Sequence, residues 1–292
     1  MSVMPRVRNL VGGGLALAGA LVCSLALAQP GQPVPASAAA SASAPLVLVV
    51  SEGTSGGLDH AQVIAKYQDL ANVVGLAVRS KVSVVFAREF ATLENGMKAG
   101  KFDFVMARPS DYPARGMRDN GYRYVANATP PGQCLIVVPK DSPLQKLSDA
   151  KGKRFVMPEQ VSYMARFCRA ELRDQGILLA GQEVKYVREQ AAVSFYIHNK
   201  LADVGGLASY SGAAKKLEQE GLRVLHASVQ QPYFPLVAHS RFDGAQIKAI
   251  QQELLGLASK PEGVEILKRI GIKEFQANGE PAMRQLLDWL EK

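Results

Sequence analysis

Two arginines follow predicted strands of the sequence, a position at which a guanidinium can bind an oxyanion. Arg88 lies just after the predicted strand 82–86, and Arg108 directly follows the predicted strand 102–107. Arginine forms paired, charge-assisted hydrogen bonds to carboxylates, phosphates and related anions. Ligands of open α/β sheets bind beyond the carboxyl ends of the strands. The two arginines are therefore candidate anion ligands, and a surface ion pair is the alternative for each.

A second candidate anion-binding feature is the beginning of a long predicted helix at Ser162. Residues 144–150 predict a short helix, residues 154–157 a buried strand and residues 159–161 a loop before this helix, which ends near Gly176. Ser162 is suited to be its N-cap. The first N–H groups of a helix have no acceptor within the helix and attract anions. The stretch therefore predicts one wall of an anion site.

The segment 51–60 is a third candidate, because it is a glycine-rich polar loop between an apolar strand and an amphipathic helix. The strand covers residues 46–50 and the helix residues 61–78. The loop lacks both the dinucleotide-binding glycine pattern and the lysine of a phosphate-binding loop, so a nucleotide site is disfavoured. An ordinary turn between strand and helix is the alternative to an anion half-site.

The elements that carry these residues alternate between strand and helix along the chain, which predicts an α/β fold. Proline-rich segments at 130–131 and 231–235 indicate two crossings between lobes. We expect two lobes, each a sheet flanked by helices. Residues 45–130 and 232–292 form the first lobe in this interpretation, and residues 131–231 form the second.

The N-terminal 28 residues have the pattern of a secretory signal peptide. Arg6 and Arg8 precede the apolar run 10–27, and Ala26-Leu27-Ala28 matches a cleavage site. A membrane anchor is less favoured because three glycines interrupt the run. Residues 29–44 read as a disordered Pro/Ala/Ser linker. We therefore expect export to the periplasm.

Lipid attachment at Cys23 is disfavoured, because the preceding Val22 stands where such a site needs a small residue. After cleavage two cysteines remain, Cys134 and Cys168. In an oxidising compartment they form either a disulfide or two separate buried thiols, and their spacing does not decide between the two. The sequence contains no cluster of metal-ligand spacing, and no cofactor is expected.

The chain carries a formal net charge of +8 with 34 basic and 26 acidic residues. The leader holds two arginines and no acid, which leaves +6 for the mature chain. A modest positive excess attracts anions. No basic run with interleaved aromatic residues is present, so nucleic-acid binding is not expected.

Three segments are similar to motifs of the phosphonate-binding family of ABC-transporter substrate-binding proteins. They are KAGKFDFVMA at 98–107, LSDAKGKRF at 147–155 and ADVGG at 202–206. The resemblance covers about residues 46–257. It implies a two-lobed Venus-flytrap fold, a small anionic solute such as a phosphonate or phosphate held between the lobes, a membrane permease and ATPase as partners, and a monomer.

The sequence departs from the family pattern at the expected ligand site. The Ser-Thr-Ser run of the family is replaced by residues 159–163, which keep only Ser162. The family's ligand-contacting His is Glu189 or Gln190 here. The carboxylates of Glu159 and Glu189 would repel a dianion if they faced it.

From the strand ends and the resemblance together, we expect ligand contacts from both lobes, including tyrosines whose rings border the cleft. The predicted contacts are Thr54, Ser55, Gly56, Arg88, Arg108, Ser110 and Tyr112 in the first lobe, and Gln160, Ser162, Tyr163, Gln190, Ser209 and Tyr210 in the second. Half-buried packing is the alternative for each tyrosine.

Two other functions remain open at this stage. The same fold could present a ligand, for example an oxyanion or arsenite, to a sensor kinase; free thiols at Cys134 and Cys168 would favour this role. An enzyme is the third hypothesis, with Asp111, Glu159 and Glu189 as acids or bases. We expect no enzyme, because His60, His198, His226 and His239 fall in different elements and form no recognisable catalytic set.

Overall fold

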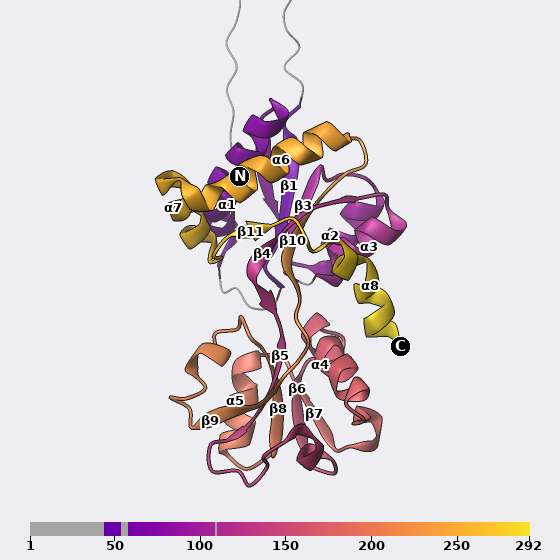
Figure 1. The fold of residues 1–292 in the computed structure, drawn as a ribbon, viewed down its shortest axis with the longest axis vertical. Coiled ribbons are helices and arrows are strands. Elements are labelled where there is room, and N and C mark those ends of the chain that lie inside the picture. Colours follow the sequence, from indigo (N-terminus) through magenta and orange to yellow (C-terminus); the bar gives the residue numbers. More distant parts are fainter. Residues whose placement is uncertain (1–43, 54–57, 109) are drawn as a thin grey trace, which may run out of the picture. The chain divides into compact units, whose positions relative to one another are not determined.

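The computed structural model describes residues 44–53, 58–108 and 110–292. In these residues, which belong to one compact unit, two β-sheets of six and five strands are flanked by helices (Figure 1). The α/β fold class predicted from the sequence is confirmed. The predictions for residues 1–43, among them the signal peptide, the linker and Cys23, concern residues outside the described ones. None of the described helices is long and apolar enough to cross a membrane.

The first sheet has the strand order β11-β4-β10-β3-β1-β2. Strands β1, β2 and β3 are parallel, and β10 runs antiparallel to both β3 and β4. Its strands are β1 (Leu46–Ser51), β2 (Val82–Phe86), β3 (Phe104–Ala107), β4 (Arg123–Gly132), β10 (Gln231–Ala238) and β11 (Phe275–Gln276).

Alternate residues of β1 face opposite sides of this sheet, as strand geometry requires. Leu48 and Val50 pack in the core formed with α1 (His60–Val78) and α6 (Gly244–Gly256). Val49 packs on the other side, in the core that includes Leu93 of α2 (Phe90–Lys98). Burial on both faces explains why β1 is a continuous apolar run.

The second sheet has the order β7-β6-β8-β5-β9. Ile136 of β5 packs in the core on the α4 side, whereas Val137 packs on the α5 side. The two helices therefore cover opposite faces. The elements are β5 (Cys134–Pro139), β6 (Phe155–Pro158), α4 (Tyr163–Asp174), β7 (Val184–Val187), α5 (Gln190–His198), β8 (Val204–Ala208) and β9 (Leu222–Ala227).

The chain passes between the two sheets twice. Strand β4 leads into β5 at Gly132–Cys134, and β9 is followed by β10, which pairs with β4 (Figure 1). Both passages fall close to the two proline-marked crossings. The lobe boundaries at 130/131 and 231/232 stay a prediction.

The C-terminal helix α8 (Glu280–Glu291) contacts both α3 (Asp111–Asp119) and α4. Its Leu286 and Leu290 are buried in the same core as Ala114 and Phe167. The ring of Trp289 meets Phe167 edge to face, with 5.1 Å between centroids. Helix α8 thus packs against α3, which follows strand β3 of the first sheet, and against α4, which covers the second sheet.

Several elements differ from the sequence-based expectations. The helix expected at 144–150 is only a 3₁₀ turn at Leu147–Ala150, because the Asp149 carboxylate accepts bonds from the N–H groups of Gln145 and Lys146. The residues after β8 form turns, with a 3₁₀ segment at Ala214–Lys216.

Helix α3 was not among the elements expected from the sequence. Pro113 is the third helical residue, where a missing N–H breaks no helical bond. Strand β11 is too short to be predicted. Further elements are the 3₁₀ turns Leu179–Gly181 and Leu257–Ser259 and helix α7 (Pro261–Ile270).

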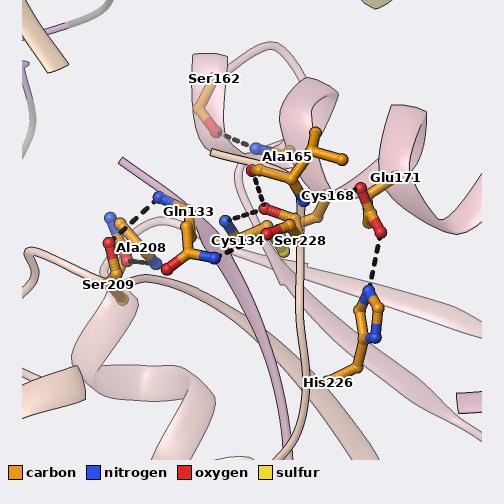
Figure 2. Close-up of a disulfide and its surroundings, with 12 residues drawn as sticks. Gln133, Cys134, Ser162, Ala165, Cys168, Glu171, Ala208, Ser209, His226 and Ser228 are labelled. Carbon is orange, nitrogen blue, oxygen red and sulfur yellow. Dashed lines mark hydrogen bonds and ion pairs between the residues drawn. A yellow bond between two sulfur atoms is a disulfide. The ribbon is translucent and has the colours of Figure 1, made fainter. Parts of the chain in front are cut away.

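A disulfide joins Cys134 of β5 to Cys168 of α4 (Figure 2). Both cysteines are fully buried. The Glu171 carboxylate, one turn further along α4, lies 2.7 Å from His226 Nε2 and accepts a bond from the N–H of Val229. Helix α4 is therefore fastened to the second sheet by a covalent bond and by polar contacts.

Replacing both cysteines by alanine should lower the free energy of unfolding by about 3 to 4 kcal/mol. The disulfide closes a loop with a sequence separation of 34 residues, and its removal increases the conformational entropy of the unfolded chain. Urea unfolding of the variant and of the wild type, each with and without reductant, measures this. A reductant that destabilises both proteins equally would contradict the assignment.

Candidate functional site

One pocket is lined by residues that follow strands of both sheets. Its lining from the first sheet and its loops is Glu52, Gly53, Phe90 and Arg108. Its lining from the second is Pro158, Glu159, Ser162, Tyr163, Met164, Arg188, Gln190 and Tyr210. The pocket thus lies at the carboxyl ends of β1, β3, β6, β7 and β8, where ligands of α/β sheets bind.

Arg108 and Glu52 are neighbours because of the register of the first sheet. Strand β1 pairs with β3 so that Ser51 is opposite Ala107. Glu52 directly follows Ser51 and Arg108 directly follows Ala107, so the two side chains begin at neighbouring points of the sheet. Arg108 Nη2 lies 3.9 Å from Glu52 Oε1, and the two side chains are 14% and 3% exposed. Gly53, with φ of 63°, adopts the left-handed turn that follows.

Phe234 lies under the guanidinium of Arg108. The Arg108 Cζ atom is 5.2 Å from the centroid of the Phe234 ring, a cation–π contact. Phe234 is fully buried and has φ of 48°, an unusual conformation for an aromatic residue. It falls within the irregular register of β10 opposite β4. The bulged strand therefore supports the arginine.

Glu52 is ionised although it is buried. Burial raises its pKa, but hydrogen bonds from Lys66 and Tyr67 and the charge of Arg108 outweigh burial, so the pKa is lowered. Lys66 Nζ and the Tyr67 hydroxyl each lie 2.5 Å from Glu52 Oε1. Both residues belong to α1, which carries them past the end of β1.

Arg108 also remains charged. Burial lowers its pKa, yet the facing Tyr233, Tyr67 and Glu52 outweigh that effect, so the pKa is raised. A desolvated cation at the end of β3 attracts an anion more strongly than a solvated one.

The opposite wall contains the beginning of α4. Ser162 is its N-cap, and its hydroxyl accepts a bond from the N–H of Ala165. The first N–H groups of the helix, on Tyr163 and Met164, have no acceptor within the helix. Both residues line the pocket, so this wall offers the positive end of the helix dipole to a ligand.

Two tyrosines on this wall supply hydroxyl groups. Burial raises the pKa of Tyr163 and of Tyr210, so both phenols are protonated at neutral pH and can donate hydrogen bonds. The ring of Tyr210 lies 4.4 Å from that of Tyr233, centroid to centroid. This contact links the second wall to β10 beside Arg108.

Arg188, Glu159 and Gln190 complete the lining. Pro158 pairs with Val187 across β6 and β7, so Glu159 and Arg188 follow paired positions and are both exposed. The Gln190 side chain accepts a bond of 2.8 Å from the N–H of Ala208, which ties it to the end of β8. One acid and one base therefore stand together at the solvated side of the pocket.

The structure brings together five of the predicted contact residues, namely Arg108, Ser162, Tyr163, Gln190 and Tyr210. Thr54, Ser55 and Gly56 lie outside the described residues. Glu52, Phe90 and Arg188 were not predicted as contacts.

The other predicted contacts lie outside the lining. Arg88 is exposed and donates to the Leu58 carbonyl, and Tyr112 stacks on Phe90. Ser110 donates to the Pro232 carbonyl and Ser209 accepts from the N–H of Gln133. Gln160 is exposed beside the pocket. The polar groups of Arg88, Ser110 and Ser209 therefore bond to the backbone.

The residues considered for catalysis are dispersed. Glu159 lines the pocket, whereas Glu189 lines a separate depression near Lys216. His226 contacts Glu171, and His239 packs on Tyr122. Within the described parts of the chain, no group of three or more His, Cys, Asp or Glu residues could hold a metal ion.

A buried ion pair connects α3 to α4 beside the pocket. Arg166 Nη2 donates to Asp111 Oδ2, and the Asp111 side chain is fully buried. Burial raises the pKa of Asp111, an effect that the charge of Arg166 and its hydrogen bond only partly offset. The pair fixes α4 relative to the helix that follows Arg108.

Two sheets with a polar pocket at their strand ends define a two-lobed solute-binding protein. The family described as "ABC transporter, phosphonate, periplasmic substrate-binding protein" matches residues 57–279, and the chain belongs to this family. Its members are periplasmic substrate-binding components of transporters rather than enzymes. No curated protein matches the sequence.

Solved structures of binding proteins share the fold. XAC2383 from Xanthomonas citri, bound to ATP, has a TM-score of 0.65 and 18% identity, covering 84% of this chain and 97% of that one. PhnD1 from Prochlorococcus marinus, in complex with methylphosphonate, has a TM-score of 0.62, 14% identity and the same coverage. The sulphonate-binding protein SsuA from Escherichia coli has a TM-score of 0.56 and 17% identity, covering 84% of each chain.

Replacing Arg166 by methionine should destabilise the protein by about 3 kcal/mol at neutral pH, because Asp111 is left buried without its cation. Without Arg166 the folded-state pKa of Asp111 rises further above its unfolded value. The loss should therefore grow as pH rises above the folded-state pKa that Asp111 has in the wild type, and shrink at lower pH, where Asp111 is protonated in the folded state of both proteins.

Urea unfolding across this pH range measures the loss, with Arg169→Met as the control, because Arg169 is exposed on the same helix. The two variants should differ most at high pH. A loss for Arg166→Met that does not change with pH would contradict the assigned role of Asp111.

Proposed function

We propose that the pocket captures a small organic oxyanion of the phosphonate or sulfonate type and delivers it to an ABC importer. The observation that carries this proposal is the position of Arg108, a buried cation that lines one pocket together with the first residues of α4. A guanidinium and a helix N-terminus are two groups that bind tetrahedral oxyanions well. PhnD1 in complex with methylphosphonate and the sulphonate-binding SsuA have the same fold, which supports this ligand class.

Capture would depend on contacts from both sheets. Arg108 follows the first sheet, and Ser162, Tyr163 and Tyr210 belong to the second. A ligand that contacts both walls binds best when the walls are close together, so binding shifts the population toward that state. A closed, loaded form is what a permease and its ATPase would recognise.

The sensor hypothesis has less support. In the described residues both cysteines are joined in the disulfide, so neither offers the free thiol that arsenite sensing would use. The family assignment also names a transport component.

Replacing Arg108 by alanine should reduce stabilisation by ligand. A ligand that binds only the folded protein raises the melting temperature, so a thermal-shift screen with methylphosphonate, methanesulfonate, phosphate and ATP identifies the ligand class. Loss of a charge-assisted contact should weaken binding at least about tenfold. Arg88→Ala is the matched control, since Arg88 is exposed outside the pocket.

The variant Arg108→Ala should still unfold cooperatively in the absence of ligand. If a screened oxyanion stabilised Arg108→Ala as much as the wild type, the proposed site would be wrong. If none of these anions stabilised the wild type, the proposed ligand class would be wrong.

A further inference from the structure

Glu52 is an acid in a pocket that otherwise has the features of an anion site. Its carboxylate is 3% exposed and lies 2.5 Å from Lys66 Nζ and 3.9 Å from Arg108 Nη2. A buried carboxylate beside an arginine weakens the attraction of that arginine for a negative ligand. The carboxylate balances the charges of Lys66 and Arg108, and it therefore also changes the charge that a ligand meets.

The charges at this end of the pocket can be counted from the contacts. Lys66 and Arg108 are two cations, and Glu52 is one anion. The phenols that face these groups, on Tyr67, Tyr210 and Tyr233, have raised pKa values and are neutral. One net positive charge remains at the end of the first sheet.

The other wall does not change this count. Glu159 and Arg188 are the charged residues among its lining side chains in the described structure, and their formal charges cancel. The beginning of α4 contributes about half a positive charge as a dipole. The described pocket therefore suits a ligand that brings one negative charge.

We propose that Glu52 is a specificity-determining residue, which makes the pocket select singly charged oxyanions over doubly charged ones. This inference rests on the proposed function. A sulfonate is a monoanion at every physiological pH. A phosphonate is a monoanion only while it keeps its last proton, and phosphate monoesters lose that proton at about pH 6. For a doubly charged headgroup, the second charge would meet the Glu52 carboxylate without a further cation to balance it.

The test is isothermal titration calorimetry with methanesulfonate and methylphosphonate between about pH 5 and about pH 9, because an alkylphosphonate loses its last proton at higher pH than a phosphate monoester. In the wild type the affinity for methanesulfonate should stay level. The affinity for methylphosphonate should fall with rising pH, approaching about tenfold per pH unit once the dianion dominates, as expected for one bound proton.

The variant Glu52→Gln adds one positive charge to the site. Its affinity for methylphosphonate should no longer fall with pH. In the double variant Glu52→Gln/Lys66→Met only Arg108 remains of the three charges, so the fall should return. Lys66→Met alone leaves no net charge beside β1 and should weaken both ligands. The wild-type profile and Lys66→Met test the proposed charge balance even if Glu52→Gln does not fold, and circular dichroism checks the folding of each variant.

The results separate two failures. If the wild type binds methylphosphonate with an affinity that does not fall with pH, or if Glu52→Gln keeps the wild-type profile, Glu52 does not select charge and the proposed function stands. If the wild type binds neither ligand at any pH, the proposed function fails and this inference fails with it.

Discussion

The pocket depends on the burial of one charged group, the guanidinium of Arg108. Moving an ion out of water costs several kcal/mol unless nearby groups replace its hydration. The replacements are the Glu52 carboxylate, which follows β1, and the face of Phe234 in β10. The sheet positions all three, because Ser51 is opposite Ala107 and Leu236 is opposite Met106. The register that builds the core of the first sheet is therefore also what makes the arginine available to a ligand.

The opposite wall is a helix end, and its position depends on how α4 is held. Cys168 bonds α4 covalently to β5, and Glu171 contacts β9 and the segment after it (Figure 2). Arg166 pairs with Asp111 of α3. These attachments are spread along the helix from its first turns to its middle. A helix fixed at several points keeps the direction of its free N–H groups, which reduces the ordering cost of binding an anion there.

Much of the fold could be predicted from periodicity, because buried strands and amphipathic helices carry their burial pattern in the sequence. The strand-end rule also found Arg108, and the capping pattern found Ser162. Arg88 satisfied the same rule but lies outside the pocket, because β2 is the edge strand of its sheet. The order of strands in a sheet cannot be predicted from the periodicity of the sequence. Glu52 escaped prediction since an acid beside a glycine-rich loop usually indicates a solvated turn. Only the register with β3 and the approach of Lys66 show that it is buried.

The net charge of the whole protein and the local charges in the pocket both act on a ligand, and they need not favour the same one. The formal net charge of +8 attracts any anion from a distance, but salt screens this attraction beyond about 8 Å. Inside the pocket, salt screens the charges less because they are buried. There the sum of the charges of Glu52, Lys66 and Arg108 determines which anions bind. A strongly cationic pocket would hold dianions, inorganic phosphate among them. A pocket that contains a carboxylate binds these dianions more weakly, and it thereby discriminates in favour of monoanions.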